Sequence, residues 1–339
     1  MKVFVLEYIT GGGFIDEMLP NGLAREGDVM LHALVADLLR VPGVEVLVPR
    51  DHRLPAGMLN ADLRRVSTER GRTAQWNRCL TDCDAVWPIA PESRGILERI
   101  SQWVLDAGKP LLNSRPAAVA LAASKLHTAR RLAEHGVPVV PTYSLQAGLA
   151  GLPLETARTW VLKPDDGVGC EGARVVDSHA ALQRAIRQID AAHWVVQPYV
   201  AGLPTSLSLL CVDGQARLLS CNRQRVERQG DGFVLHGCVV NSDAARHPRC
   251  AELAAAIARA VPGLWGYVGV DLVLTVRGPC VLEINPRLTT SYAGLYGALG
   301  VNGAQQVLGL LGRDSVPMAA PPSGRNAVVD VALETAYVA

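Results

Sequence analysis

Val281-Leu282-Glu283-Ile284-Asn285-Pro286-Arg287 is the stretch of this 339-residue chain that says most about its fold. Glu283 and Asn285 alternate with apolar neighbours, so in a β-strand their side chains point to the same face. The upstream segment 269–276 is also mainly apolar. Because Arg277-Gly278-Pro279 between the two segments favours a tight turn, we predict an antiparallel β-hairpin.

The expected pairing of this hairpin places three polar side chains together. If Arg277-Gly278-Pro279 forms a three-residue turn, Asp271 faces Asn285 and Val273 faces Glu283. Asp271, Glu283 and Asn285 then share one face, and their oxygen atoms are the ligands that Mg²⁺ prefers. The alternative is an ordinary polar face on a half-exposed hairpin, and a slip of one residue in the pairing would break the alignment.

Lysine is rare in the chain, which makes the position of each lysine informative. Among the 33 basic residues the lysines are Lys2, Lys109, Lys125 and Lys163. Arginine suffices on a solvated surface, whereas a compact ammonium group suits a phosphate at close range. Lys125 opens an expected helix after Ser124, and Lys163 ends an apolar strand. We therefore treat these two as candidate phosphate ligands and assign Lys2 and Lys109 mostly to chance.

Two further segments have the character of a nucleotide site. Lys163 is followed by a loop with Gly167, Gly169 and Gly172, and glycines let backbone N–H groups approach phosphate oxygens closely. The loop lacks the GxxxxGK[ST] pattern of a P-loop, so it predicts a hairpin flap instead. Val195-Val196-Gln197-Pro198-Tyr199-Val200 runs from an apolar strand into an extended linker, where backbone groups can pair with a purine edge.

The first third of the chain alternates strand and helix signals. Strands are expected at 3–6, 44–48 and 85–88, and helices at 28–40 and Ile96–Asp106. This order is typical of an α/β domain with a mainly parallel sheet. We therefore predict a small parallel-sheet α/β domain that ends near residue 112.

After residue 112 the pattern changes to α+β with antiparallel pairs. Asn113 or Ser114 is expected to cap a helix that begins at Pro116, and the next helix is expected at Lys125–Glu134. The expected strands are 160–163, 174–176, 194–197, 206–212, 216–221, 269–276, 280–284 and a late one at 327–338, and the expected later helices are 180–189 and 249–260. We place a second domain at 113–312, with two subdomains that separate near 195–202, and a tail at 313–339.

Composition and charge argue against several classes of protein. The net charge of +1 gives no whole-chain argument for a nucleic-acid or membrane-surface partner. No apolar run reaches the roughly 18 residues that a membrane span needs. The eight cysteines include one close pair, Cys79 and Cys83, which lacks the spacing of a zinc site. We expect reduced thiols in a cytoplasmic protein.

The order of these signals, from Ser124-Lys125 through the glycine flap to the Glu-x-Asn strand, resembles the ATP-grasp superfamily of carboxylate–amine ligases. The resemblance covers about residues 113–311, and the preceding third looks like the domain that usually comes before the ATP-grasp fold. It implies ATP and Mg²⁺ as cofactors, with Mn²⁺ as an alternative ion. By resemblance, Lys125, Lys163, Gly167, Gly169 and Gly172 contact the phosphates, Gln197, Tyr199 and Val200 contact adenine, and Asp271, Glu283 and Asn285 hold Mg²⁺. Many members hold the ribose with a Glu where this chain has Pro204, so the ribose contact is unassigned.

Three shorter stretches resemble the ATP-grasp group that contains tyramine–L-glutamate ligase. They are Leu6-Glu7-Tyr8-Ile9-Thr10-Gly11-Gly12-Gly13, Ala90-Pro91-Glu92 and Asn285-Pro286-Arg287-Leu288-Thr289-Thr290-Ser291-Tyr292. This resemblance implies an ATP-dependent reaction that joins a carboxylate, such as that of glutamate, to an amine, such as tyramine. The reaction would pass through an acyl phosphate and release ADP and phosphate. Both substrates would be small molecules, and a homodimer is common among such enzymes.

Two arginines are candidates for binding the acyl phosphate or a substrate carboxylate, because a guanidinium fork fits both anions. Arg287 follows the predicted metal strand directly, and Arg223 lies in the segment Cys221-Asn222-Arg223-Gln224-Arg225. For Arg223 an ordinary surface arginine is about equally compatible with the sequence.

Several interpretations stay open from the sequence. Thr10-Gly11-Gly12-Gly13 is either a turn that helps to wall the acceptor pocket, with Glu7, Tyr8 and Glu92 nearby, or a purely structural turn. It lacks the GxGxxG pattern of a dinucleotide site. The alternatives to a tyramine–glutamate ligase are a ligase that joins amino acids, a non-catalytic ATP-binding protein, and a nicotinamide-dependent oxidoreductase built on the first domain.

Overall fold

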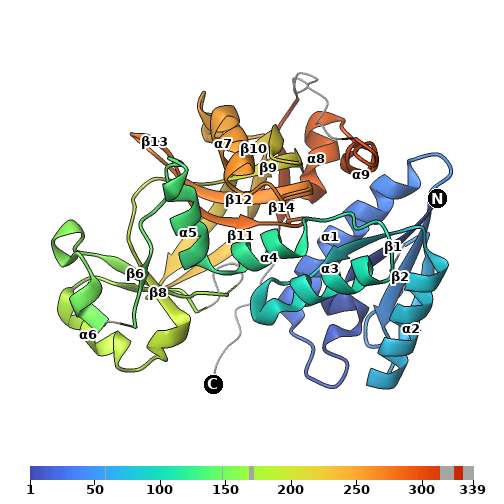
Figure 1. Cartoon of the computed structure of the whole chain (residues 1–339), viewed down its shortest axis with the longest axis horizontal. Coiled ribbons are helices and arrows are strands. Elements are labelled where there is room, and N and C mark those ends of the chain that lie inside the picture. Colours follow the sequence, from blue (N-terminus) through green and yellow to red (C-terminus); the bar gives the residue numbers. More distant parts are fainter. Residues whose placement is uncertain (58, 147, 168–171, 314–323, 331–339) are drawn as a thin grey trace.

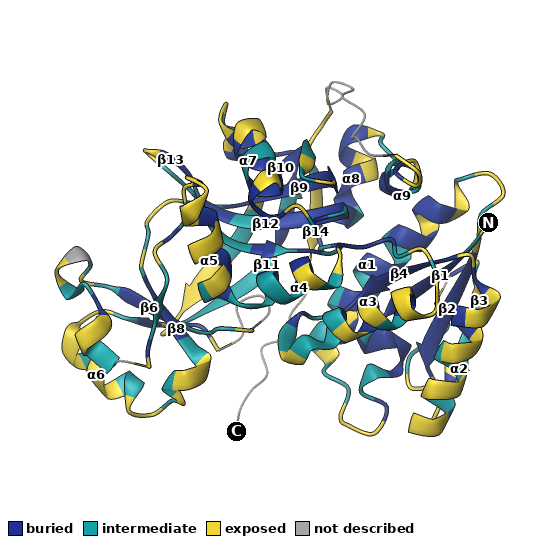
Figure 2. Cartoon of the chain, in the orientation of Figure 1, coloured by how far each residue is buried: buried dark blue, intermediate teal, exposed yellow. Residues whose placement is uncertain are grey.

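The computed structural model describes residues 1–57, 59–146, 148–167, 172–313 and 324–330. Its strands form three sheets. In Figure 1 the sheet of the N-terminal third and the sheet of residues 143–198 lie at opposite ends of the molecule, with the six-stranded sheet between them. Figure 2 shows buried residues along the strands and exposed residues on the outer faces of the helices.

The N-terminal sheet is parallel, in the order β3-β2-β1-β4, which confirms the predicted class of this region. Its elements are β1 (Lys2–Glu7), α1 (Asn21–Leu39), β2 (Glu45–Asp51), β3 (Asp62–Val66), α2 (Glu69–Asp82), β4 (Ala85–Ile89) and α3 (Ile96–Asp106). The sequence did not predict β3 and α2, because neither has an apolar period. The residues of β3 are DLRRV, and α2 buries Cys79 and Leu80 alone among its residues. Helix α1 begins earlier than the predicted residue 28, with polar residues in its first turns.

Two short helices, α4 (Pro116–Ala123) and α5 (Lys125–Glu134), follow this sheet. The predicted cap of α4 is wrong, because Arg115 occupies the capping position without a side-chain hydrogen bond. The Ser114 hydroxyl is engaged elsewhere, since it accepts a hydrogen bond from Trp265 N at 3.2 Å. Ser124 caps α5 by accepting a hydrogen bond from His127 N at 3.1 Å.

The sheet of residues 143–198 is antiparallel, in the order β5-β8-β6-β7. Its elements are β5 (Tyr143–Ser144), β6 (Trp160–Pro164), β7 (Arg174–Val176), α6 (His179–Ile186) and β8 (Trp194–Pro198), with short turns at η3 (Gly148–Gly151), η4 (Leu154–Thr156) and η5 (Ala191–His193). Trp160, Leu162 and Val196 belong to its own hydrophobic core. The three predicted strands of this region end within one residue of the observed ones.

The six-stranded sheet has the order β13-β12-β9-β10-β11-β14 and is antiparallel in every pair. Its strands and the later helices are β9 (Leu203–Val212), β10 (Gln215–Gln229), β11 (Gly232–Val240), η6 (Asp243–Ala245), α7 (Cys250–Ala260), β12 (Gly266–Thr275), β13 (Gly278–Asn285), α8 (Tyr292–Leu299), α9 (Gly303–Leu308) and β14 (Ala327–Asp330). The long end of β10 was not predicted, because its polar residues follow no apolar pattern. Its partner β11 was also missed, although its sequence GFVLHGCVV is mainly apolar. Residues 331–338, the rest of the predicted late strand, lie outside the described residues.

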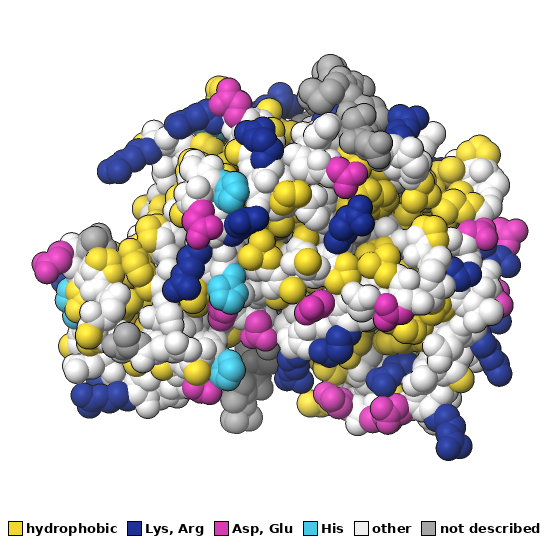
Figure 3. All heavy atoms as spheres, viewed as in Figure 1, with side chains coloured by type: hydrophobic (Ala, Val, Ile, Leu, Met, Phe, Trp, Pro, Cys, Tyr) yellow, Lys and Arg dark blue, Asp and Glu magenta, His cyan; other side chains and the backbone are white. Residues whose placement is uncertain are grey.

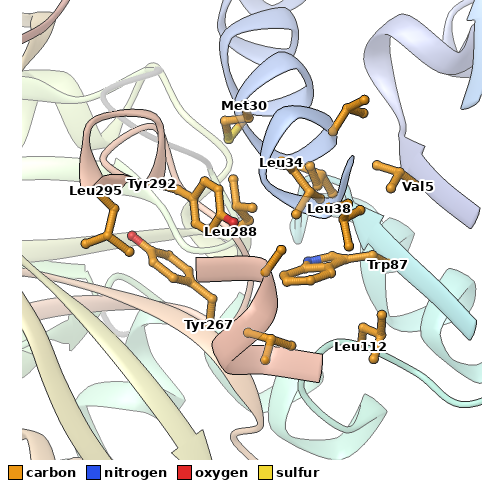
Figure 4. Close-up of a cluster of buried hydrophobic side chains, with 14 of the residues drawn as sticks. Val5, Met30, Leu34, Leu38, Trp87, Leu112, Tyr267, Leu288, Tyr292 and Leu295 are labelled. Carbon is orange, nitrogen blue, oxygen red and sulfur yellow. The ribbon is translucent and has the colours of Figure 1, made fainter. Parts of the chain in front are cut away.

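One hydrophobic core joins the N-terminal sheet to the six-stranded sheet. Leu34 and Leu38 of α1 and Trp87 of β4 belong to the same buried cluster as Tyr267 of β12 and Tyr292 of α8. Figure 4 shows these side chains converging from the two parts of the chain. The two parts are therefore held together by apolar burial.

Asp37 of α1 adds a buried polar contact across this core. Its Oδ2 accepts hydrogen bonds from Tyr292 Oη at 2.9 Å and from Gly303 N at 3.3 Å, and its backbone oxygen accepts one from Asn302 Nδ2 at 2.7 Å. Burial raises the pKa of Asp37, and the hydrogen bond from Tyr292 acts in the opposite direction. These contacts fix α1 against α8 and the start of α9.

The surface agrees with the low net charge. Basic and acidic side chains are interspersed over the face shown in Figure 3. The described cysteines are free thiols. None of the described helices combines the length and the apolar content that a membrane crossing requires.

We expect Tyr292→Phe to lower the free energy of unfolding by about 1–3 kcal/mol, because the buried Asp37 carboxylate loses a hydrogen-bond donor. Thermal or denaturant unfolding measures this change. Tyr296→Phe is the matched control, since Tyr296 lies on the same helix and is 42% exposed. The control should change stability by less than about 0.5 kcal/mol. Equal losses in both variants would contradict the role of the Tyr292 hydroxyl.

Candidate active site

The hairpin of β12 and β13 has a different register from the predicted one. Asp271 pairs with Glu283 rather than with Asn285. The turn is also tighter than expected, because Thr275 already pairs with Gly278. The predicted three-residue turn is therefore wrong.

A β-bulge decides which face Glu283 occupies. On the turn side of the bulge Leu272 pairs with Val281, and beyond it Asp271 pairs with Glu283, so Leu282 is the extra residue. Without the bulge Asp271 would pair with Leu282, and Glu283 would point to the opposite face. The predicted and observed registers differ by an even number of residues beyond the bulge, which is why the three polar side chains still share one face.

We call Asp271, Glu283 and Asn285 the acidic face. Asp271 accepts hydrogen bonds from Asn285 Nδ2 at 3.1 Å and from Gln224 Nε2 at 2.7 Å. Burial, and then the negative charge of Glu283, raise the pKa of Asp271 to about 7. Two carboxylates and an amide form a set of hard oxygen donors whose mutual repulsion a divalent cation relieves, so the residues present fit Mg²⁺. Gln224 was not predicted, and its only sequence signal is its place beside Arg223.

Lys125 links the acidic face to the glycine flap. The side chain is 5% exposed, and its Nζ lies 3.5 Å from Glu283 Oε2. The same Nζ donates a hydrogen bond to Gly167 O at 2.5 Å. The buried ammonium group of Lys125 thus lies between the carbonyl of Gly167 in the flap and the acidic face. It can interact there with an anion that binds between the flap and the acidic face.

Asp165 holds the start of α5 against the base of the flap. Its carboxylate accepts hydrogen bonds from Ser124 Oγ at 2.7 Å and from Leu126 N at 2.9 Å, and its backbone oxygen accepts one from Lys125 N at 3.1 Å. A carboxylate at a helix N-terminus is favourable, because it meets free N–H groups and the positive end of the helix dipole. The position of Lys125 is therefore fixed from both sides.

The rest of the predicted phosphate site lies around β6. Lys163 is partly exposed and points to the opposite face from Trp160 and Leu162, which pack into the core of that sheet. Gly172 has a φ of +69°, and a Cβ there would lie 3.0 Å from the Pro164 side chain, so the flap requires glycine at this place. Gly169 lies outside the described residues.

The predicted adenine segment follows β8. Gln197 is buried, and its Nε2 donates a hydrogen bond to Thr142 Oγ1 at 2.9 Å. Tyr199 N donates to Thr159 O at 2.9 Å, while the Tyr199 ring is 45% exposed. Of this segment's groups, the Gln197 side chain and the Tyr199 N–H are thus already bonded within the protein. The contacts of Gln197, Tyr199 and Val200 with adenine stay a prediction.

Arg287 joins the acidic strand to the N-terminal sheet. Its Nε lies 2.9 Å from Glu92 Oε1, and its Nη2 donates a hydrogen bond to Glu92 Oε2 at 3.2 Å. Burial acts to lower the pKa of the Arg287 guanidinium, but the carboxylates of Glu92, Glu26 and Glu283 together raise it. Just beyond Glu92, in the turn η2 (Ser93–Gly95), Arg94 N donates to Asp166 Oδ2 at 3.2 Å. The segment that follows β4 of the N-terminal sheet therefore contacts both Arg287 and the base of the flap.

Arg223 is not brought into this group by any contact that the described residues make. It is exposed on β10, between Thr205 and Val239 of the neighbouring strands. Its neighbour Gln224 makes the contact with Asp271 instead. The geometry thus separates the two arginines that the sequence treated as alternatives.

The glycine turn after β1, η1 (Ile9–Gly13), has clear structural requirements. Gly12 has a φ of +95°, and a Cβ there would lie 2.7 Å from Val66. Glu7 is 2% exposed and accepts hydrogen bonds from Thr10 N at 2.6 Å and from Ile9 N at 3.3 Å. Burial raises the pKa of Glu7 to about 7, against these hydrogen bonds. Glu7 thus secures the turn.

Comparison with known proteins finds matches over most of the chain. A family model described as an ATP-grasp domain matches residues 122–291, and one described as a pre ATP-grasp 3 domain matches residues 44–119. The chain is 25% identical over 296 residues to a tyramine–L-glutamate ligase of Methanocaldococcus fervens, covering 86% of this chain and 89% of that protein.

Solved structures have the same fold. A crystal structure of an ATP-grasp superfamily protein from Archaeoglobus fulgidus matches with a TM-score of 0.70 and 22% identity, over 97% of this chain and 99% of that one. An L-amino acid ligase from Bacillus licheniformis matches with a TM-score of 0.64 and 16% identity, over 91% of this chain and 73% of that one. Because the matched family model spans half of its length, the chain belongs to the ATP-grasp family.

Proposed function

We propose that this chain uses ATP to join the carboxylate of a small molecule such as glutamate to a primary amine such as tyramine. The observation that carries the proposal is the position of Lys125, whose ammonium group contacts both the flap carbonyl of Gly167 and Glu283 of the acidic face. This position suits a phosphate chain that lies between a flap and a metal site. ATP-grasp ligases use ATP with Mg²⁺, so the two cofactors follow from the family.

The acidic face and the two lysines have separate tasks in this proposal. Asp271, Glu283 and Asn285 would hold Mg²⁺, which when bound offsets the charge of phosphate oxygens. Lys125 and Lys163 would neutralise the phosphates from the protein side, and the glycines Gly167, Gly169 and Gly172 would let backbone N–H groups approach them. Gln197, Tyr199 and Val200 would border the adenine.

Arg287 would bind the carboxylate and then the acyl phosphate formed from it. The pair with Glu92 supports this role, because it fixes the plane of the guanidinium before substrate binds. In the second step the amine nitrogen bonds to the acyl carbon, the bond from that carbon to the phosphate oxygen breaks, and phosphate leaves with the electron pair. Arg223 is exposed and has the weaker support as an anion ligand.

The choice of substrates rests on the relatives. The match to tyramine–L-glutamate ligases favours glutamate and tyramine. A ligase that joins two amino acids is the second candidate, and the structural match to an L-amino acid ligase favours it at the level of fold. A cytoplasmic homodimer belongs to the proposal as a family expectation.

A coupling assay tests the proposal. Release of ADP and phosphate from Mg-ATP is measured with a panel of carboxylates, a panel of amines including tyramine, and both together. We expect ADP and phosphate only when glutamate and an amine are both present, because the acyl phosphate needs an acceptor. AMP and pyrophosphate as products would contradict the acyl-phosphate route. Tight Mg-ATP binding without turnover on any pair would favour a non-catalytic ATP-binding protein.

We expect Glu283→Gln to lower kcat by roughly 100-fold or more, because the acidic face loses one of its two carboxylates. The melting temperature should change little, since loss of the repulsion with Asp271 is offset by loss of the ion pair with the buried Lys125. Glu252→Gln is the control, because Glu252 lies exposed on α7. Full activity of Glu283→Gln would contradict the assignment of Glu283 as a Mg²⁺ ligand.

We expect Lys163→Ala to weaken Mg-ATP binding by about tenfold or more, as the loss of a charge-assisted contact to phosphate predicts. Isothermal titration calorimetry with a non-hydrolysable ATP analogue measures the affinity. Lys2→Ala serves as the comparison, because Lys2 is at the N-terminal end of β1 and pairs with the exposed Glu45. An unchanged affinity in Lys163→Ala would place the phosphates elsewhere.

A further inference from the structure

A cavity of about 300 Å³ lies between α2 and α3, on one face of the N-terminal sheet. These two helices pack against Phe4 and Leu6 of β1, whereas α1 packs against Val3 and Val5 on the other face. The helices that follow the neighbouring strands β1 and β4 thus lie on opposite faces of the sheet. Open α/β sheets bind ligands at such a point, outside the carboxyl ends of the strands.

Three aromatic side chains, Tyr8, Trp76 and Trp103, line this cavity and are half-buried. The ring centroids of Tyr8 and Trp76 are 6.1 Å apart, and those of Trp76 and Trp103 are 6.5 Å apart. Behind them the buried Phe4 packs edge-on against Trp103. A cavity of roughly 150 Å³ is enough for benzene, so the space in front of the rings admits one more aromatic ring. Such a ring gains from stacked or edge-to-face contacts.

The glycine turn η1 holds two of these rings in place. Trp76 Nε1 donates a hydrogen bond to Gly11 O at 3.0 Å. A Cβ at Gly13 would collide with the Tyr8 ring, so the ring occupies its position only with glycine there. Because both rings are fixed in the protein alone, a ligand that packs between them pays little ordering cost on the protein side.

The charged groups at the cavity are cations. The Arg72 guanidinium lies 5.6 Å from the centroid of the Trp76 ring and pairs with Glu69 at 3.2 Å. Arg99 lines the cavity from α3. Among the described residues that line the cavity none is acidic. A guanidinium only donates hydrogen bonds, so these two arginines favour an electron-rich oxygen on the ligand and disfavour an ammonium group inside the cavity.

The wall that α3 provides is hydrogen-bonded to the segment that contacts the candidate active site. Arg99 Nη1 donates a hydrogen bond to Arg94 O at 2.6 Å, and Arg94 N donates to Asp166 Oδ2 at 3.2 Å, at the base of the flap. Glu92 of the same segment pairs with Arg287 at 2.9 Å. A ligand that contacts Arg99 is therefore two hydrogen bonds away from the flap base.

We propose that this cavity binds a single aromatic ring with an electron-rich oxygen substituent, as in a phenol. The ring lies among Tyr8, Trp76 and Trp103, with its oxygen toward Arg72 and Arg99. Two kinds of ligand share this chemistry: a phenolic acceptor amine whose ammonium group stays outside the cavity, and a phenolic effector that is not consumed. The site goes beyond the proposed function, because binding of the ring needs no turnover.

Binding is measured by isothermal titration calorimetry on the full chain with 4-ethylphenol, which has the ring and hydroxyl of tyramine but no amine. The matched ligand is 4-ethylcyclohexanol, which keeps the size and the hydroxyl but has no aromatic ring. We expect saturable binding of 4-ethylphenol at one site, with 4-ethylcyclohexanol about fivefold weaker or more. Trp76→Leu should weaken the binding of 4-ethylphenol by about tenfold or more.

The variants separate ring, charge and fold. Trp76→Phe keeps an aromatic ring and should retain more affinity than Trp76→Leu. Arg72→Gln should weaken binding by about fivefold, because the phenol oxygen loses a charged donor. Arg70→Gln makes the same change at an exposed position of α2 and should leave the affinity unchanged. Circular dichroism and Mg-ATP binding verify that the variants are folded.

Three results of the titrations would overturn the proposal. They are no saturable binding of 4-ethylphenol up to its solubility, equal affinity for 4-ethylcyclohexanol, and unchanged affinity in Trp76→Leu. None of them depends on whether the chain has ligase activity.

Steady-state kinetics with Mg-ATP, L-glutamate and tyramine then identifies the ligand. If 4-ethylphenol raises the KM for tyramine and leaves kcat unchanged, the cavity holds the ring of the acceptor amine. If it changes kcat without competing with tyramine, the cavity holds an effector. Binding of 4-ethylphenol with no effect on either parameter would contradict both ligands. Saturable binding without turnover on any substrate pair would contradict the proposed function and leave the aromatic site standing, so the two failures are distinguishable.

Discussion

The close approach of two carboxylates across the β12–β13 hairpin is the constraint on which the site depends. Asp271 and Glu283 are paired only because Leu282 is the extra residue of a bulge, and burial together with Glu283 raises the pKa of Asp271 to about 7. Two neighbouring carboxylates repel each other when both are charged, and nearby cations make their approach favourable. Lys125 supplies one cation, at 3.5 Å from Glu283, and the donor set fits a divalent ion as the other.

The N-terminal part of the chain contributes contacts to the candidate site. Glu92 fixes the Arg287 guanidinium, Arg94 N bonds to Asp166 at the base of the flap, and Glu26 accepts a hydrogen bond from Thr290. These polar contacts are possible because a common apolar core and the Asp37–Tyr292 hydrogen bond hold the two parts in one arrangement. In the proposed function, residues after 112 would form the nucleotide side of the site, and both parts of the chain would contribute to the acceptor side.

Sequence reasoning worked best where local signals are strong. Helices α3 and α5 and strand β7 have the predicted bounds, because each has an apolar pattern or a clear boundary residue. It failed for β3, α2 and the outer half of β10, whose polar residues become ordered only by pairing or packing with distant neighbours. It also failed for the cap of α4, because the Ser114 hydroxyl is occupied by Trp265, a residue far along the chain.

The sequence by itself determined the types of chemical group and their order: two unusual lysines, a glycine-rich loop, an aspartate, and glutamate and asparagine two residues apart on a strand. It also determined the family, whose model spans residues 122–291. Only the tertiary structure decided the register of the hairpin, the partner of Arg287 and the position of Glu26. The contacts of Arg287 with Glu92 and of Thr290 with Glu26 join residues 195 and 264 positions apart. Contacts of that range leave no local pattern, because they are set by how helices and sheets pack rather than by the preferences of neighbouring residues.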